Sequence, residues 1–101
     1  MTGTYGISFQ NGDTNRAFDY TIDTANTWEQ KEIVIQPDTG GTWAKDNTLG
    51  MRINFGLAMG SSRSDAPSSS WYTSGDIRGS DNQVNWMATA NNEFYLTGVQ
   101  L

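Results

Sequence analysis

The chain has 101 residues and a formal net charge of −5, and it contains neither cysteine nor histidine. This length suits one small domain, and the two missing residue types exclude disulfides, thiolate chemistry and the commonest general base and metal ligand. Six basic residues against eleven acidic ones make nucleic acid a poor partner, and no apolar run approaches the roughly 20 residues of a membrane span.

The first quarter of the chain predicts a β-hairpin. Thr4–Gln10 and Arg16–Asp23 both alternate apolar with small or polar residues, which is typical of half-buried strands. The segment between them, Asn11–Asn15, contains an Asn-Gly pair, which favours a tight turn with positive φ. We therefore expect the two strands to pair with each other.

Two more strands are predicted in the middle of the chain. Trp28–Gln36 is the first, and Pro37 ends it because proline has no N–H group for a strand ladder. Leu49–Gly60 is the second and the most apolar. Between them, Asp38–Thr48 is predicted to be a loop, and it contains Trp43.

Residues Ser61–Asn91 show no strong periodicity and predict a long loop, with a short strand or a single turn at the sequence VNWM. Asn92–Leu101 predicts a final strand, in which a bulge at Thr97–Gly98 would keep one inward row of side chains. Short strands without helical periodicity predict an all-β fold, an antiparallel β-sandwich of jelly-roll type, in a single domain over residues 1–101. The expected core consists of Tyr5, Ile7, Phe9, Phe18, Tyr20, Ile22, Ile33, Ile35, Met51, Ile53, Phe55, Leu57, Phe94 and Leu96.

The chemistry of an enzyme is not favoured by these residues. Pairs of Asp or Glu perform glycoside hydrolysis, but none of the eleven acidic residues sits in an apolar stretch that would raise its pKa. The serines have no histidine to activate them as nucleophiles. We therefore expect a protein without catalytic residues.

Aromatic residues in loops are the best candidates for a binding site. Trp and Tyr rings stack on the apolar faces of sugars, and neighbouring polar side chains bind the sugar hydroxyl groups. The alternative is that tryptophans cover the edges of a thin core, which is the favoured interpretation for Trp28 and Trp86 because both flank strands. The candidate carbohydrate-binding residues are Trp43, Trp71, Tyr72, Asp76 and Arg78.

Calcium is the one metal for which the chain offers suitable ligands, because hard oxygen donors are the donors available. The loops NGDTN and DTGGTWAKDN contain the candidate ligands Asp13, Asn15, Asp38 and Asp46. No EF-hand pattern occurs. The alternative is that these Asp and Asn residues only form turns.

Two stretches carry a resemblance to a known family: TWEQKEIVIQPDTGGTW and FYLTGVQL. Together with the strand between them, they resemble a domain of the structural proteins of tailed bacteriophages, found in tail fibres and on virion surfaces. The resemblance covers nearly the whole chain and implies a jelly roll of the carbohydrate-binding-module type, in which a structural calcium is common. Such domains have at least one more strand before Thr4 and continue beyond GVQL, so this chain resembles most of a domain that lacks one or more terminal strands.

The resemblance implies a non-enzymatic domain that is structural, adhesive or both, made in the host cytoplasm and carried on the extracellular virion. Its implied partners are other virion subunits or copies of itself, together with a cell-surface glycan, without nucleic acid or membrane insertion. The alternative is a carbohydrate-binding module of a secreted polysaccharide-degrading enzyme. A small hydrolase is disfavoured by the missing histidine.

The final strand also predicts association. Asn92–Leu101 carries one charged residue, Glu93, and no proline, so little protects its edge from pairing with another chain. We expect that the native protein is not a free monomer: either a longer chain continues the sheet, or another subunit covers this region.

Overall fold

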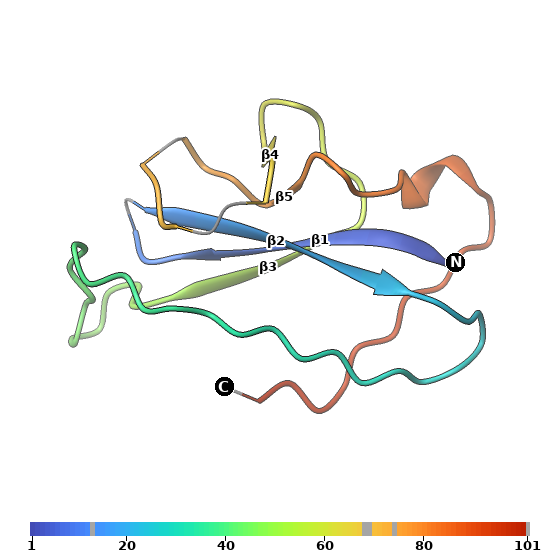
Figure 1. Ribbon diagram of the computed structural model, residues 1–101, viewed down its shortest axis with the longest axis horizontal. Coiled ribbons are helices and arrows are strands. Elements are labelled where there is room, and N and C mark those ends of the chain that lie inside the picture. Colours follow the sequence, from blue (N-terminus) through green and yellow to red (C-terminus); the bar gives the residue numbers. More distant parts are fainter. Residues whose placement is uncertain (13, 68–69, 74, 101) are drawn as a thin grey trace.

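A computed structural model of the chain describes residues 1–12, 14–67, 70–73 and 75–100. Its centre is a three-stranded antiparallel sheet in the order β2-β1-β3, crossed on one side by a short parallel pair of strands (Figure 1). In the described residues the helical structure is a single 3-10 turn, so the fold is β-rich as expected. The elements are β1 (Gly3–Gln10), β2 (Asn15–Ile22), β3 (Arg52–Gly56), β4 (Ser64–Asp65), β5 (Gly79–Ser80) and the 3-10 turn η1 (Trp86–Ala88).

The predicted hairpin is confirmed. β1 and β2 pair over their full lengths, from Gly3 opposite Ile22 to Gln10 opposite Asn15. The turn between them places Gly12 at a φ of 105°, which a residue without Cβ adopts readily. The predicted strand Leu49–Gly60 is shorter than expected, because only its central part, β3, pairs with β1.

One face of the sheet is apolar and forms the core. Tyr5, Ile7 and Phe9 alternate along β1 and are between 1% and 5% exposed. The ring of Tyr5 stacks on Tyr20 in the neighbouring strand at a centroid distance of 5.8 Å, and Phe94 from the C-terminal segment covers it at 6.0 Å. This face is covered by the two extended segments that run beneath the sheet, residues 28–36 and 92–100 (Figure 1).

The other face of the sheet is polar yet also buried. Ser8 and Gln10 on β1 are 0% and 4% exposed, because the segment around β5 packs on them. Ser8 Oγ donates a hydrogen bond to the carbonyl of Ile77 at 2.9 Å, and Gln10 Nε2 donates to the same carbonyl at 3.1 Å. These hydrogen bonds attach the segment around β5 to the sheet. Ile77 in this segment is itself buried, at 5% exposed.

The strands predicted at Trp28–Gln36 and Asn92–Leu101 are wrong: residues 28–36 and 92–100 form no ladder. Leu101 lies outside the described residues. Both segments are extended beneath the sheet. Burial alternates around Val34, which is 71% exposed between the half-buried Ile33 and Ile35, and Phe94 is half-buried, but residues 95–100 are all exposed. The periodicity therefore predicted the direction of some side chains but not a hydrogen-bonding partner. Without a ladder, the predicted bulge at Thr97–Gly98 does not exist, although Gly98 has a positive φ of 62°.

The predicted core is confirmed in full for three residues of β1 and is wrong for Leu96, which is 51% exposed because its segment has no second layer outside it. The described strands form one three-stranded and one two-stranded sheet, and the jelly-roll arrangement stays a prediction. No described helix has the length and apolar character needed to cross a membrane. The remaining predicted core residues are half-buried: Phe18, Tyr20, Ile22, Ile33, Ile35, Met51, Ile53, Phe55, Leu57 and Phe94.

Candidate functional site

Two of the loop tryptophans predicted to bind sugars come together in the structure. Trp43 and Trp71, far apart in sequence, meet edge to face at a centroid distance of 5.6 Å and an interplanar angle of 84°. Trp43 Nε1 donates to the carbonyl of Asp38 at 3.0 Å, and Trp71 Nε1 donates to the carbonyl of Gln36 at 2.7 Å. Because one short stretch of backbone fixes both indole rings, they form a rigid pair. Both side chains are half-buried, so part of each ring reaches the surface.

Asp38 holds this stretch of backbone in place. Its Oδ1 accepts hydrogen bonds from the amides of Gly40 and Gly41 at 3.1 and 3.0 Å. Its Oδ2 accepts from Thr14 Oγ1 at 2.7 Å and from Asn11 Nδ2 at 2.8 Å, which ties the loop to the hairpin turn. These hydrogen bonds, that of Thr14 above all, lower the pKa of Asp38. The carboxylate therefore serves as a charged anchor for the loop.

A hollow of about 260 Å³ opens beside Trp71. The guanidinium of Arg16 forms part of its wall; this residue is 6% exposed, lies 4.7 Å from the centroid of the Phe18 ring and donates to the carbonyl of Gln36 at 3.5 Å. This volume is slightly smaller than that of typical ligand pockets, which suits one sugar ring better than a larger ligand. We call it the Trp71 hollow, and its lining residues are Arg16, Gln36, Pro37, Asp38, Thr39, Ser70 and Trp71.

The other predicted carbohydrate-binding residues lie elsewhere. Tyr72 exchanges backbone hydrogen bonds with Asn15 at 2.8 and 3.0 Å, which extends the edge of β2, and burial raises the pKa of its hydroxyl group. Asp76 and Arg78 form an ion pair at 2.5 Å on the polar side of the sheet. The five predicted residues thus separate into an aromatic pair, a structural tyrosine and an ion pair.

The Asp76 ion pair belongs to a larger charged cluster. Arg63 Nη1 lies 3.0 Å from Asp76 Oδ2, and Arg52 Nη1 lies 3.9 Å from Asp76 Oδ1. Gln10, on the buried polar face of the sheet, donates a hydrogen bond from Nε2 to Asp76 Oδ1 at 2.7 Å. The hydrogen bond from Arg78, followed by that from Gln10, lowers the pKa of Asp76 from 3.8 to about 2.

The candidate calcium ligands that the structure describes are engaged by different partners. Asn15 Oδ1 accepts from Gln10 Nε2 at 2.6 Å, and Asp46 Oδ1 accepts from the backbone nitrogen of Thr48 at 2.8 Å. Asp38 anchors its own loop, and Asp13 lies outside the described residues. No group of three or more acidic side chains gathers in the described ranges. Calcium binding stays a prediction.

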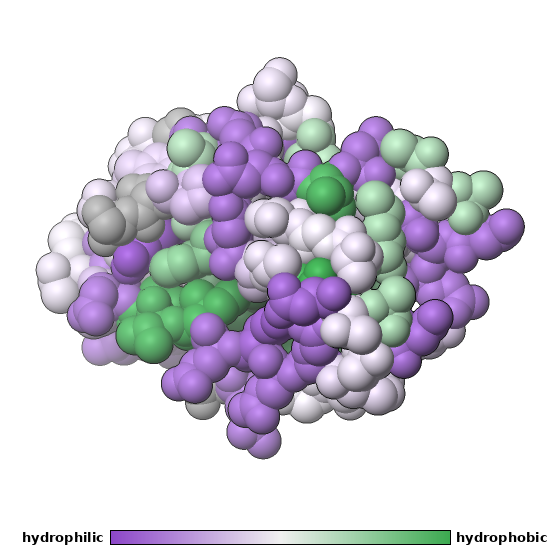
Figure 2. Space-filling model, turned by 45° about the vertical axis from the view of Figure 1, so that its right-hand side comes forward, coloured by the Kyte–Doolittle hydropathy of each residue, from purple (hydrophilic) through white to green (hydrophobic). Residues whose placement is uncertain are grey.

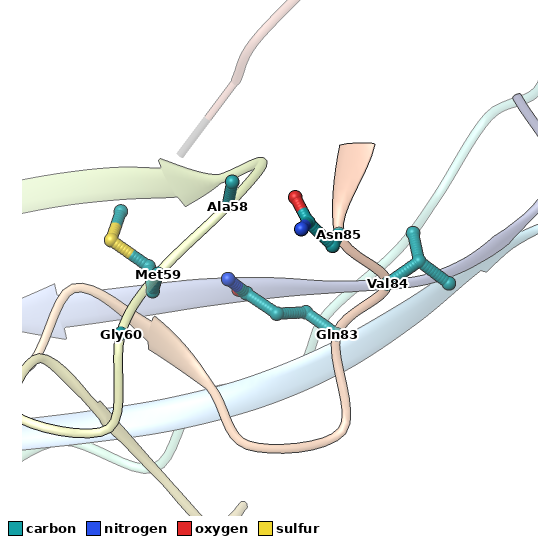
Figure 3. A pocket seen from close by; sticks show the side chains of 6 residues that line it. All are labelled: Ala58, Met59, Gly60, Gln83, Val84 and Asn85. Atoms are coloured by element: carbon teal, nitrogen blue, oxygen red, sulfur yellow. The ribbon is translucent and has the colours of Figure 1, made fainter. Parts of the chain in front are cut away.

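A second hollow, of about 310 Å³, lies between the end of β3 and the segment before η1, and the amide of Gln83 reaches into it (Figure 3). Its walls also include Met59 and Val84. Gln83 Oε1 accepts from the amide of Ser80 at 3.3 Å, where glycines give it room: a Cβ on Gly56 or Gly79 would lie 2.5 Å from that oxygen. Sequence reasoning missed this hollow, because two glycines far apart in the chain gave no local signal.

Comparisons of this chain with models of protein families, with curated proteins and with solved structures find no match. The geometry of the Trp71 hollow and of the arginine cluster around Asp76 therefore carries the functional inference. Arg52 and Arg63 in that cluster were not predicted from the sequence.

Proposed function

We propose that this chain is a non-enzymatic binding domain of a bacteriophage virion, on a tail fibre or on the particle surface, with an arrangement related to the jelly rolls of carbohydrate-binding modules. The resemblance of the sequence to such domains and the β-rich fold support this proposal. Its binding function is to hold a glycan at the Trp71 hollow.

The observation that carries the proposal is the pairing of Trp43 with Trp71 beside an open hollow. An indole ring offers a large apolar face to the C–H groups of a sugar, and it loses little entropy on binding when its orientation is already fixed. Here the backbone of residues 36–38 fixes both rings. Thr39 and Ser70 add hydroxyl-bearing side chains to the lining, and Arg16 adds a cation.

The state of the carboxyl groups supports a binding function over hydrolysis. A glycosidase needs one carboxylic acid with a raised pKa as its general acid. Among the described carboxyl groups whose pKa departs from its ordinary value, hydrogen bonds lower it in each case. These groups are Glu29, Asp38, Asp46 and Asp76.

Replacing Trp71 by alanine is expected to reduce glycan binding by at least about tenfold, because one buried aromatic contact contributes on the order of 1.5 kcal/mol or more. The measurement is binding to a glycan array, followed by calorimetry on the best ligand. Trp28→Ala is the matched control, since Trp28 is 68% exposed and contacts Tyr95 at 6.3 Å rather than the hollow.

The melting temperature of both variants is measured alongside. The proposal requires a Trp71→Ala protein that stays folded, with unchanged binding by the Trp28→Ala protein. Full glycan binding by a folded Trp71→Ala protein would contradict it, and so would the absence of any glycan ligand for the unmodified chain.

The implied partners of this domain include copies of itself or other virion subunits, and a lower apolar surface supports that part of the proposal. Five large apolar side chains on the extended segments 28–36 and 92–100 are between 51% and 71% exposed. Apolar residues also gather into a patch among hydrophilic ones on the face shown in Figure 2. The residues of the lower apolar surface are Trp28, Val34, Tyr95, Leu96 and Val99.

We expect the 101-residue chain to associate at micromolar concentration, because exposed large apolar side chains favour burial against a second molecule. Light scattering should give a mass above the 11.1 kDa of one chain. Replacing both Val34 and Leu96 by serine should shift the measured distribution of molecular masses towards the mass of a single chain. A soluble species of one-chain mass before any substitution would show that this surface needs no partner.

A further inference from the structure

Three of the six basic residues of the chain meet at one carboxylate. Arg78 and Arg63 lie 2.5 and 3.0 Å from Asp76 Oδ2, and Arg52 lies 3.9 Å from Oδ1. In the described residues, no other carboxylate lies within ion-pair distance of these three guanidinium groups. These four side chains together carry a charge of +2 on a protein whose net charge is −5.

The cluster is built on ordered structure. Arg52 belongs to β3, and Arg63 and Arg78 immediately precede β4 and β5, where the amide of Arg78 donates to the carbonyl of Arg63 at 2.8 Å. Asp76 is fixed from below by Gln10, which is 4% exposed. The arginine side chains are therefore placed by the sheet and by a buried amide.

The guanidinium groups retain capacity for a ligand. Each guanidinium has five N–H donors in a planar fork. Arg63 donates to Asp76 through Nη1, and Arg78 donates to it through Nε and Nη2. The side chains of Arg52, Arg63 and Arg78 are 44%, 51% and 45% exposed. The donors that do not face Asp76 therefore have access to an anion arriving from solvent.

We infer that Arg52, Arg63 and Arg78 form a second binding site, for the oxyanion of an acidic saccharide. Planar guanidinium groups match the geometry of carboxylate and sulfate oxygens, with two parallel hydrogen bonds per pair. The saccharide part of this inference rests on the proposed glycan-binding function. Trp71 and Asp76 are five positions apart, so their Cα atoms lie within about 18 Å of each other.

Calorimetry with three oligosaccharides of equal length, one neutral, one carrying uronate groups and one sulfated, tests the inference at low ionic strength. We expect an acidic saccharide to bind about tenfold more tightly than the neutral one, with the difference shrinking in salt. Comparison of the uronate and sulfated ligands identifies the oxyanion. Arg63→Gln should reduce the acidic preference about fivefold or more and leave binding of the neutral ligand unchanged. Lys45→Gln, which removes one charge from an exposed residue outside both sites, should leave both affinities unchanged.

Equal affinity of the unmodified protein for neutral and acidic ligands would overturn the inference. The inference would also be overturned if the Lys45→Gln protein lost as much of the preference for acidic ligands as the Arg63→Gln protein does. The preference would then depend on the net charge of the protein and not on the arginine cluster. In either case, loss of neutral binding by Trp71→Ala would leave the proposed function standing. If acidic binding depends on Arg63 while Trp71→Ala has no effect on any ligand, the arginine site stands and the proposed function at the Trp71 hollow fails.

Discussion

Replacing Phe9 by alanine is expected to lower the free energy of unfolding by about 3–5 kcal/mol. The side chain is 3% exposed near the C-terminal end of β1, and its ring meets Phe18 edge to face at a centroid distance of 5.8 Å. Phe9 is one of five apolar residues in the described part of the chain that are 5% exposed or less, so few other buried side chains can compensate for its loss. For a domain of this size the expected loss is a large part of the total stability. Urea unfolding followed by fluorescence measures it.

Leu96→Ala is the matched control, because Leu96 is 51% exposed and buries little area. We expect it to change the free energy of unfolding by about 0.5 kcal/mol or less. A Phe9→Ala protein as stable as the Leu96→Ala protein would show that β1 does not lie at the centre of the core.

Replacing Gly6 by alanine is expected to cost about 1–3 kcal/mol through overpacking. A Cβ at Gly6 would overlap the backbone nitrogen of Ser80 and lie 2.7 Å from Gln83 Oε1. Alanine loses less conformational entropy than glycine when it is placed in a strand, which alone would raise the free energy of unfolding by about 0.5–1 kcal/mol. The clash outweighs this gain, because its main partner is the backbone of β5 rather than a flexible side chain.

Gly40→Ala provides the comparison. A Cβ there would meet Asp38 Oδ1 at 3.8 Å, an ordinary contact, so stability should stay the same or rise by up to about 1 kcal/mol. The Gly6→Ala protein should therefore melt at a lower temperature than the Gly40→Ala protein. Equal melting temperatures would mean that β5 does not pack closely on β1.

The hairpin could be predicted from the sequence because its information is local. The alternation of apolar with small or polar residues in Thr4–Gln10 and Arg16–Asp23 predicted which side chains lie on each face of the hairpin. The pair Asn11-Gly12 predicted the turn between the two strands. The same alternation in residues 28–36 and 92–100 predicted strands that do not form. A ladder requires a partner at the right distance, and that depends on distant parts of the chain. Alternation alone specifies only which side chains face inward.

The candidate site was predictable in its residue types but not in its grouping. Trp43 and Trp71 were expected in loops, but the contact between them depends on hydrogen bonds from both indoles to residues 36–38. Arg78 and Asp76 are close in sequence, and their pairing is short-range. Arg52 and Arg63 join them only because β3 and the segment before β4 converge above Gln10, which no local pattern indicates.

The most direct measurement of glycan binding at the Trp71 hollow is a titration of the nitrogen-15-labelled protein with an oligosaccharide, followed through the indole N–H signals. The four tryptophans give four such signals. Binding at the hollow should move the signals of Trp43 and Trp71 with one common affinity and leave that of Trp28, on the lower apolar surface, in place. Movement of the Trp28 signal with Trp43 and Trp71 unchanged, or no movement with any glycan, would contradict the proposed function.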